Sequence, residues 1–185
     1  MKHLLVITGA IAAGKSTFAR SLSQRYQVTV LTKDDIKEVL GDSVGFANRE
    51  ENKRLSVAAV QILVHVFRAT AKAGADLILE ANFSEKEIAC LYEAAKEHGY
   101  SVLTIFLYGD SAILHQRYLY RMRHENRHPA HLSAVIEDPE EFRRIQEYLE
   151  GVRIPGEVVR ICADDFSYAQ DGDILQRLDR FMSDT

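Results

Sequence analysis

Residues 9–17, GAIAAGKST, combine two glycines with a lysine and two hydroxyl side chains at a spacing suited to phosphate. They fit the pattern G-x-x-x-x-G-K-[ST], in which the loop curls so that successive backbone N–H groups point at an anion. A helix starting at its end adds partial positive charge. We expect Lys15 to reach the β- and γ-phosphates and Ser16 to bind Mg²⁺. The predicted nucleotide-binding residues are Gly9, Ala10, Ile11, Ala12, Ala13, Gly14, Lys15, Ser16 and Thr17.

Two aspartates directly follow the β-branched segment at residues 27–32. If that segment is a strand of a parallel sheet, its carboxyl end lies beside the phosphate loop, where ligands bind in such sheets. A carboxylate there can accept a proton from an attacking hydroxyl. We therefore predict that Asp34 is the catalytic base and contacts the acceptor, with Asp35 as a capping or supporting residue. The alternative is that Asp34 only caps the following helix.

Polar side chains also follow the apolar run at residues 76–82. Glu80 is predicted to join Ser16 in the magnesium shell; the alternative is a strand-end carboxylate in water. Asn82 is predicted to bind the acceptor or the nucleotide. Lys37, one turn beyond Asp34, is predicted to contact the acceptor, although a solvated helix lysine is an equally good interpretation.

Residues 114–131 form the most basic part of the chain, with four arginines, four histidines and a single acid. Arg117 and Arg121 are four residues apart and share a helix face. Arginine on a mobile segment commonly offsets the charge that develops during phosphoryl transfer. We predict a lid over residues 110–135, with Arg117 and Arg121 catalytic and Arg127 contacting the substrate. The alternative is a solvated basic helix.

Three histidines in this segment, His124, His128 and His131, allow a zinc site as an alternative. However, Pro129 disrupts the helical register between them, and no cysteine or carboxylate trio joins them. Hydrogen bonds or a pH-sensitive charge in the lid are the favoured interpretation.

Apolar runs alternate with segments of helical periodicity along the whole chain, which predicts parallel strands joined by right-handed crossovers. We expect a single α/β domain over residues 1–185 with about five parallel strands. Residues 41–54 are polar and are expected to form a loop. The predicted strands are 2–8, 27–32, 76–82, 100–108 and 157–162, and the predicted helices are 16–22, 33–40, 55–73, 84–98, 110–129, 139–150 and 173–182.

The bulk composition is that of an ordinary globular protein, with 46% hydrophobic residues and a net charge of -4. This charge argues against a general nucleic-acid binder. The cysteines, Cys90 and Cys162, are interpreted as core residues in a reducing compartment. The apolar run Leu4–Ile7 is too short for a signal peptide, and no stretch approaches the length of a membrane span. We expect a cytoplasmic protein without a membrane partner.

These motifs resemble the P-loop kinase superfamily of small-molecule and polynucleotide kinases. The resemblance covers most of the chain and rests on residues 9–17, KDDIK at 33–37, LEANF at 79–83 and the Arg117/Arg121 helix, in that order. It implies a three-layer P-loop NTPase fold with strand order 2-3-1-4-5, and ATP and Mg²⁺ as cofactors. It also implies that adenine lies between a lid arginine, Arg117 or Arg121, and residues 163–165, which include Asp164.

Within this superfamily, the 5′-kinase domain of polynucleotide kinase is similar in its first two motifs. That similarity implies that Asp34 is the base. Lys37 stands where that domain has an arginine that contacts the acceptor phosphate, and Glu80 replaces its usual aspartate. A polynucleotide 5′-end is therefore a less favoured partner. Gluconate kinase and the antibiotic-phosphorylating and toxin-like kinases share the same outline.

The leading prediction is an ATP- and Mg²⁺-dependent phosphotransferase that moves the γ-phosphoryl group to a hydroxyl of a small-molecule or nucleotide-like acceptor. A GTPase-type switch is one alternative. It requires Asn-Lys-x-Asp to read guanine, but Asn52-Lys53 is followed by Arg54-Leu55. A nucleotide-binding regulator without kinase activity is the other. The acceptor and the oligomeric state stay open.

Overall fold

A five-stranded parallel sheet forms the centre of the protein in the computed structural model, which describes residues 2–132 and 135–183. Its strand order is β2-β3-β1-β4-β5, which confirms the predicted α/β fold class and the order implied by the resemblance. The strands are β1 (Lys2–Gly9), β2 (Thr29–Thr32), β3 (Leu77–Glu80), β4 (Tyr100–Tyr108) and β5 (Glu157–Cys162). Residues 133 and 134 of the predicted lid lie outside the described residues.

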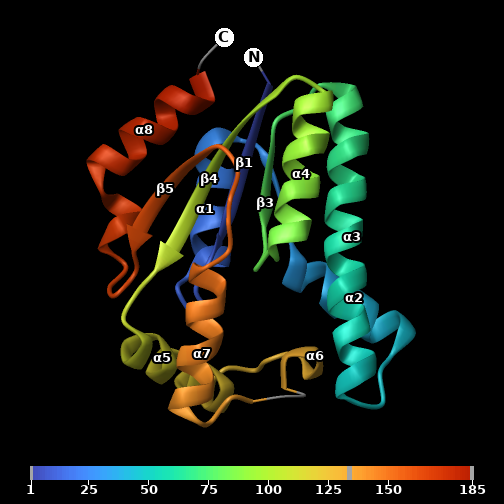
Figure 1. Ribbon diagram of the computed structural model, residues 1–185, viewed down its shortest axis with the longest axis vertical. Helices are drawn as coiled ribbons and strands as arrows, with labels where there is room; N and C mark the ends of the chain where they lie inside the picture. The colour runs from blue at the N-terminus through green and yellow to red at the C-terminus, as the bar shows by residue number, and fades with distance from the viewer. Residues whose placement is uncertain (1, 133–134, 184–185) are drawn as a thin grey trace.

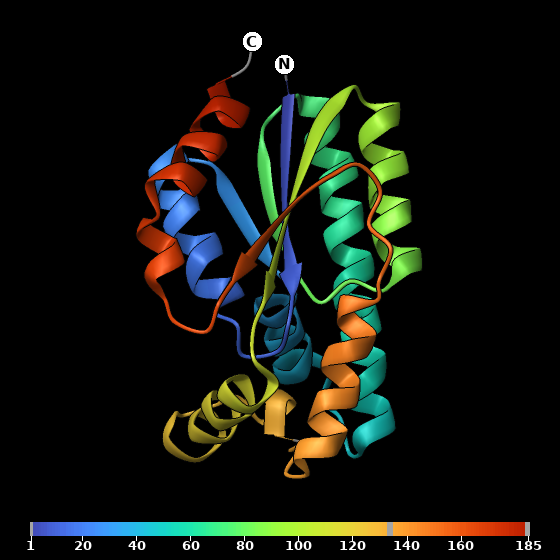
Figure 2. The ribbon, with the colours of Figure 1, turned by 60° about the vertical axis from the view of Figure 1, so that its left-hand side comes forward.

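Helices cover both faces of the sheet, giving three layers (Figure 1). Figure 2 shows α1 and α8 on one face, α3 and α4 on the other, and α5, α6 and α7 gathered beyond the carboxyl ends of the strands. The helices are α1 (Lys15–Tyr26), α2 (Lys33–Val44), α3 (Arg49–Ala73), α4 (Glu85–Glu97), α5 (Ser111–His124), α6 (Pro129–Leu132), α7 (Pro139–Glu150) and α8 (Gly172–Ser183), with a short 3₁₀ helix, η1 (Ser167–Gln170).

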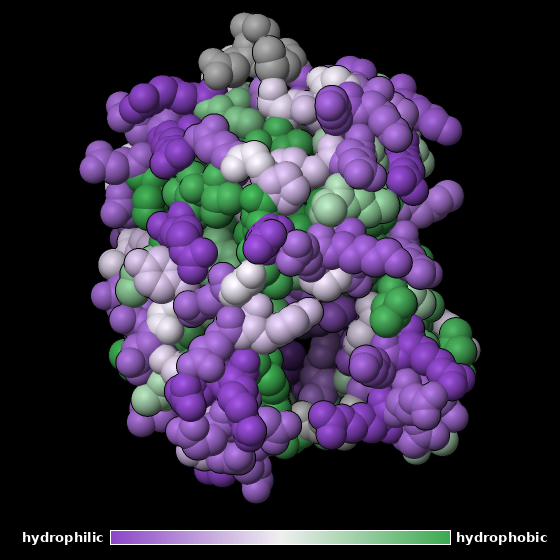
Figure 3. Space-filling view, viewed as in Figure 1, coloured by the Kyte–Doolittle hydropathy of each residue, from purple (hydrophilic) through white to green (hydrophobic). Residues whose placement is uncertain are grey.

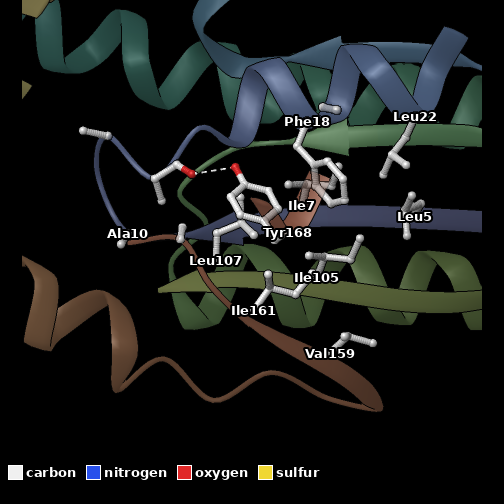
Figure 4. Close-up of a cluster of buried hydrophobic side chains, with 14 of the residues drawn as sticks. Leu5, Ile7, Ala10, Phe18, Leu22, Ile105, Leu107, Val159, Ile161 and Tyr168 are labelled. Atoms are coloured by element: carbon white, nitrogen blue, oxygen red, sulfur yellow. Dashed lines mark hydrogen bonds between the residues drawn. The ribbon is translucent and has the colours of Figure 1, made fainter. Parts of the chain in front are cut away.

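The central strand β1 is hydrophobic on both faces because both are covered by helices. Leu4 to Ile7 are fully buried. Their side chains alternate between two cores: Leu5 and Ile7 pack toward α1, while Leu4 and Val6 pack toward α3 and α4. Figure 4 shows the first of these cores, in which Phe18 of α1 meets Tyr168 edge to face at a ring distance of 5.2 Å.

The strand register places the predicted site residues side by side at the same end of the sheet. Ile7 of β1 pairs with Glu80 of β3, which in turn pairs with Thr32 of β2. The phosphate loop leaves β1 two residues after Ile7, and Asp34 lies two residues after Thr32. Since the strands are parallel, these groups meet at the carboxyl edge of the sheet.

The predicted loop at residues 41–54 is wrong. Helix α2 continues to Val44 and α3 already begins at Arg49, after Asn48, whose side chain accepts a hydrogen bond from the Glu51 backbone N–H. Gly41 does not end α2; a Cβ there would lie 3.1 Å from His128 Cε1, so the glycine allows the segment before α6 to pack closely. The Asn48-x-x-Glu51 spacing is a helix-start signal in the sequence.

Helix α3 has 25 residues and is long and apolar enough to cross a membrane by length and composition alone. This corrects the expectation that no stretch approaches that length. In the fold, its Leu63 and Phe67 are fully buried against the sheet, as in a core helix. The cysteine prediction also needs correction, because Cys162 is exposed and Cys90 is only partly buried.

Candidate active site

The phosphate loop adopts a backbone shape that its glycines make possible. Gly9 has a φ of +123°, and a Cβ there would lie 2.1 Å from the Leu107 carbonyl oxygen of β4. Gly14 has a φ of +86° and is the N-cap of α1, without a side chain that caps the helix. The first N–H groups of α1 therefore stay open to an anion, and the helix dipole favours negative charge at the same place.

Lys15 lies inside this loop and is 8% exposed. Its Nζ donates a hydrogen bond to the Ala10 carbonyl oxygen at 2.6 Å. Burial lowers the pKa of the Lys15 ammonium, while the carboxylates of Glu80 and Asp34 act against that change. The ammonium therefore sits where the charge of a phosphate would stabilise it.

Ser16 and Glu80 present two oxygen atoms to the same space. The Ser16 hydroxyl donates to Glu80 Oε2 at 2.9 Å, and Glu80 is 4% exposed. Burial raises the pKa of the Glu80 carboxyl, while Lys15 acts in the opposite direction. A buried carboxylate beside a hydroxyl fits Mg²⁺, which takes one or two carboxylates together with phosphate and water oxygens. Burial at this level excludes the alternative of a strand-end carboxylate in water.

The start of α2 separates the roles of the two aspartates. Thr32 is the N-cap of α2, and its hydroxyl accepts the Asp35 N–H at 3.0 Å, so Asp34 does not cap this helix. Asp35 forms an ion pair with Arg20 at 2.9 Å. Within residues 2–132 and 135–183, no hydrogen bond or ion pair engages the Asp34 carboxylate. Asp34 is therefore the aspartate free to act on a ligand.

These groups share one cavity of about 310 Å³. Figure 3 shows that face of the molecule hollowed between α7 and the α2–α3 pair, with hydrophilic side chains inside. The charged and polar side chains that line the cavity are Lys15, Ser16, Thr17, Arg20, Lys33, Asp34, Asp35, Glu38, Glu80, Asn82, Tyr118, Arg121, Arg127 and His131. The predicted residues Asp34, Glu80, Asn82, Arg121 and Arg127 thus lie around the loop.

Arg117 and Arg121 occupy different positions on α5. The Arg117 guanidinium donates to the backbone carbonyls of Ala163 and Asp164 and stacks on the Phe166 ring at 4.6 Å. Arg121 lines the cavity just described and also a second one of about 590 Å³, where Arg117 and Phe166 form another wall. The arrangement places Arg121 near the phosphate loop and Arg117 in the wall of the second cavity.

Two predicted contacts lie elsewhere. Lys37 is outside both cavities; its Nζ donates to the Ala130 carbonyl at 2.8 Å and ties α2 to α6, so this contact does not support a role with the acceptor. The Asp164 carboxylate accepts the Asp110 N–H at 2.6 Å, which leaves Phe166 as the side chain of this loop that faces the second cavity.

The histidines of the basic segment have separate partners. His128 and His131 bond through Nε2 to Asp42 at 3.0 Å and to Glu38 at 2.8 Å, and His124 bonds to the Tyr120 carbonyl. Burial lowers the pKa of His131, which lines the first cavity. These bonds fit the favoured interpretation that the histidines supply hydrogen bonds to the lid, and those of His128 and His131 join it to α2.

Gln146 on α7 was missed by the sequence reasoning. Its side chain, 4% exposed, accepts the Ile11 N–H at 2.9 Å and donates to the Ile11 carbonyl at 3.3 Å. Tyr168 was also missed; its hydroxyl donates to the Ala13 carbonyl at 2.9 Å (Figure 4). The tip of the loop is thus held by residues more than a hundred positions away. Nothing local in the sequence indicates these contacts.

We expect Gln146→Leu to raise the KM for ATP about tenfold. The substitution leaves both polar groups of Ile11 without a partner, at a cost of about 1–3 kcal/mol. Tyr148→Leu, at an exposed position of the same helix, is the control and is expected to leave KM unchanged. Steady-state ATP consumption measures both. An unaltered KM in Gln146→Leu would show that the loop keeps its shape without this residue.

Comparisons with known proteins agree with this architecture. A family profile described as an AAA domain matches residues 4–145. A protein from Chloroflexus aurantiacus, provisionally described as a kinase, is 23% identical with a TM-score of 0.84, and the match covers 99% of each chain. The search of curated proteins gave no significant match.

Two further solved structures share the fold at lower identity. A gluconokinase from Sinorhizobium meliloti is 14% identical with a TM-score of 0.57, over 98% of this chain and 91% of that one. The APS kinase from Mycobacterium tuberculosis, solved with AMPPNP and APS, is 16% identical with a TM-score of 0.59, over 96% and 98% of the two chains. At these identities the likeness concerns the fold.

Proposed function

The chain belongs to the AAA domain family and has the fold of the P-loop kinase superfamily, and from this premise we propose that it transfers the γ-phosphoryl group of ATP to a hydroxyl of a small-molecule or nucleotide-like acceptor. One observation carries the proposal. The Asp34 carboxylate, which has no hydrogen-bond or ion-pair partner among the described residues, lines the same cavity as Lys15 of the phosphate loop. A phosphate cradle alone requires binding only, whereas a free carboxylate facing it supports transfer.

The proposed donor site combines the loop with the second cavity. The open N–H groups at the start of α1 and the Lys15 ammonium receive the phosphates. Phe166, 55% exposed, offers an aromatic face beside Arg117, and we propose that the adenine stacks there. Ser16 and Glu80 would hold Mg²⁺, which when bound neutralises phosphate charge.

The proposed reaction is a direct displacement. Asp34 accepts the proton of the acceptor hydroxyl, the hydroxyl oxygen forms a bond to the γ-phosphorus, and the bond from that phosphorus to the β–γ bridging oxygen breaks to release ADP. Arg121, between the two cavities, offsets the negative charge that develops on the phosphoryl oxygens. In this scheme Arg117 holds the wall of the second cavity against which the adenine stacks. Residues 110–135 act as a lid, and residues 1–185 form one domain. A role in the cytoplasm, where ATP and Mg²⁺ are abundant, is part of the proposal.

An ATP-consumption screen tests the proposal directly. It covers nucleosides, sugars, sugar acids, aminoglycosides and 5′-hydroxyl oligonucleotides, with a phosphorylated product identified by mass. A phosphorylated product with ATP supports the kinase. GTP hydrolysis that no acceptor stimulates would favour the switch class instead.

We expect Phe166→Ala to raise the KM for ATP about tenfold or more. Stacking of a base on an aromatic ring contributes about 1–3 kcal/mol. Phe166→Tyr keeps the ring and is expected to retain the KM of the unaltered protein. Equal KM values for Phe166→Ala and the parent would place the adenine elsewhere.

A further inference from the structure

Arg127 lies in the segment between α5 and α6 and lines the first cavity. Its Nε is buried and has no hydrogen-bond partner in the described part of the chain. No ion pair joins its guanidinium to another residue within 2–132 and 135–183. A buried guanidinium nitrogen without a partner is costly, because burial removes its water without a replacement hydrogen bond. This geometry is expected of a group that meets a ligand.

Most other charged groups in the cavity are engaged with each other or with neighbours. The pairs are Arg20–Asp35, Arg121–Glu125, His131–Glu38 and Ser16–Glu80, and Lys15 bonds to the Ala10 carbonyl. Among the described residues, Lys33, Asp34 and Arg127 line the cavity without such a partner. Two free cations thus face one free carboxylate, and that carboxylate has the proposed role of base.

The same side of the cavity offers groups for hydroxyls. Burial lowers the pKa of His131, which favours the neutral ring. With Nε2 donating to Glu38, its Nδ1 is left as an acceptor. Asn82 adds an amide that can donate and accept. The cavity of about 310 Å³ is at the small end of ligand sites, roughly 300–1,000 Å³, and part of it belongs to the phosphate of the donor.

We propose that the acceptor is a small hydroxylated anion, whose carboxylate or phosphate group pairs with Arg127 and whose hydroxyl faces Asp34. This rests on the proposed function, since it assigns the second substrate of the same site. A neutral polyol could accept a hydrogen bond from Arg127 but would leave its positive charge without a counter-charge. A cationic acceptor such as an aminoglycoside would be repelled by Lys33 and Arg127. Its own positive charge would also pair with the Asp34 carboxylate, which is the proposed base.

The Nε–H signal of Arg127 in a ¹H–¹⁵N spectrum tests the proposal, with assignment by its loss in Arg127→Gln. The protein is saturated with Mg²⁺ and AMPPNP so that added anions do not occupy the phosphate loop. D-Gluconate, inorganic phosphate and D-glucose are titrated separately at matched ionic strength. We expect a saturable shift of this signal with gluconate or phosphate and none with glucose. Comparison of the gluconate titration with the phosphate titration distinguishes a carboxylate ligand from a phosphate ligand. No saturable shift with either anion, or the same shift with glucose, would overturn the proposal.

Turnover provides the second readout. With the acceptors that support ATP consumption, Arg127→Gln is expected to lower kcat/KM about ten- to hundredfold, the usual range for a hydrogen bond to a charged group. Arg127→Lys is expected to recover part of this loss. Arg123→Gln is the matched control, because Arg123, in the last turn of α5, is exposed and lines neither cavity. If a neutral or cationic acceptor has a higher kcat/KM than every anionic acceptor in the unaltered protein, the proposal that the acceptor is an anion is contradicted.

The two proposals fail in different ways. If AMPPNP leaves the backbone signals of residues 9–17 unchanged, the proposed function fails, and titration of gluconate without nucleotide still reports on Arg127. If AMPPNP binds and the anions do not shift the Arg127 signal, only the assignment of the acceptor fails.

Discussion

Lys15→Ala is expected to reduce ATP turnover by about three orders of magnitude or more. The ammonium is a buried cation at the start of α1, and burial makes its interaction with a phosphate stronger than in water. Its removal also takes away the cationic charge that lowers the pKa of the Glu80 carboxyl. Initial rates of ATP consumption measure the effect, and circular dichroism checks that the fold is intact.

The exposed Lys53 on α3 lines neither cavity, so Lys53→Ala serves as the control with unchanged turnover. Lys15→Arg gives a second check because it keeps the charge with another shape. If Lys15→Ala folds and turns over ATP at the original rate, the loop at residues 9–17 is not the donor site.

Asp34→Asn is expected to lower kcat for phosphoryl transfer by roughly 10²–10⁴-fold, the range of a general base. The amide keeps the size of the side chain and removes its capacity to accept a proton. Because Thr32 caps α2, Asp34→Asn leaves the start of that helix intact. ATP affinity, measured as a dissociation constant, is expected to change little.

Asp35→Asn separates the two aspartates. The Asp35 carboxylate is engaged by Arg20, and both side chains are more than half exposed, so the pair contributes little to stability. We expect less than about a tenfold loss of kcat from this substitution. If Asp35→Asn has the large effect and Asp34→Asn does not, the assignment of the base is reversed.

The sheet was predictable because its signals are local. Each buried strand is a short apolar run followed by a helix of clear periodicity, and parallel pairing through right-handed crossovers limits the possible topologies. The strand order came from the resemblance of motifs. The error at residues 41–54 has a physical cause: a glycine among polar residues is typical of a break, whereas Gly41 lies inside α2 and permits close packing of His128 against it.

The site was predictable in part for the same reason. The phosphate loop is a contiguous motif, and the position of Asp34 and Glu80 follows from strand ends in one sheet. The contacts of Gln146, Phe166 and Lys37 were not predictable, because each depends on how a distant helix or loop packs over the sheet. Sequence spacing gives no information on which arginine of α5 faces the loop after β5.

The location of the γ-phosphate after turnover tests the central claim most directly. The protein, with Mg²⁺ and ATP labelled at the γ-phosphate, is incubated with each acceptor of the screen, in parallel with Asp34→Asn. Transfer predicts label in a hydroxyl ester of at least one acceptor, and a loss of that ester of roughly 10²–10⁴-fold in Asp34→Asn. Label found only in inorganic phosphate with every acceptor, at the same rate in both proteins, would contradict phosphoryl transfer through Asp34.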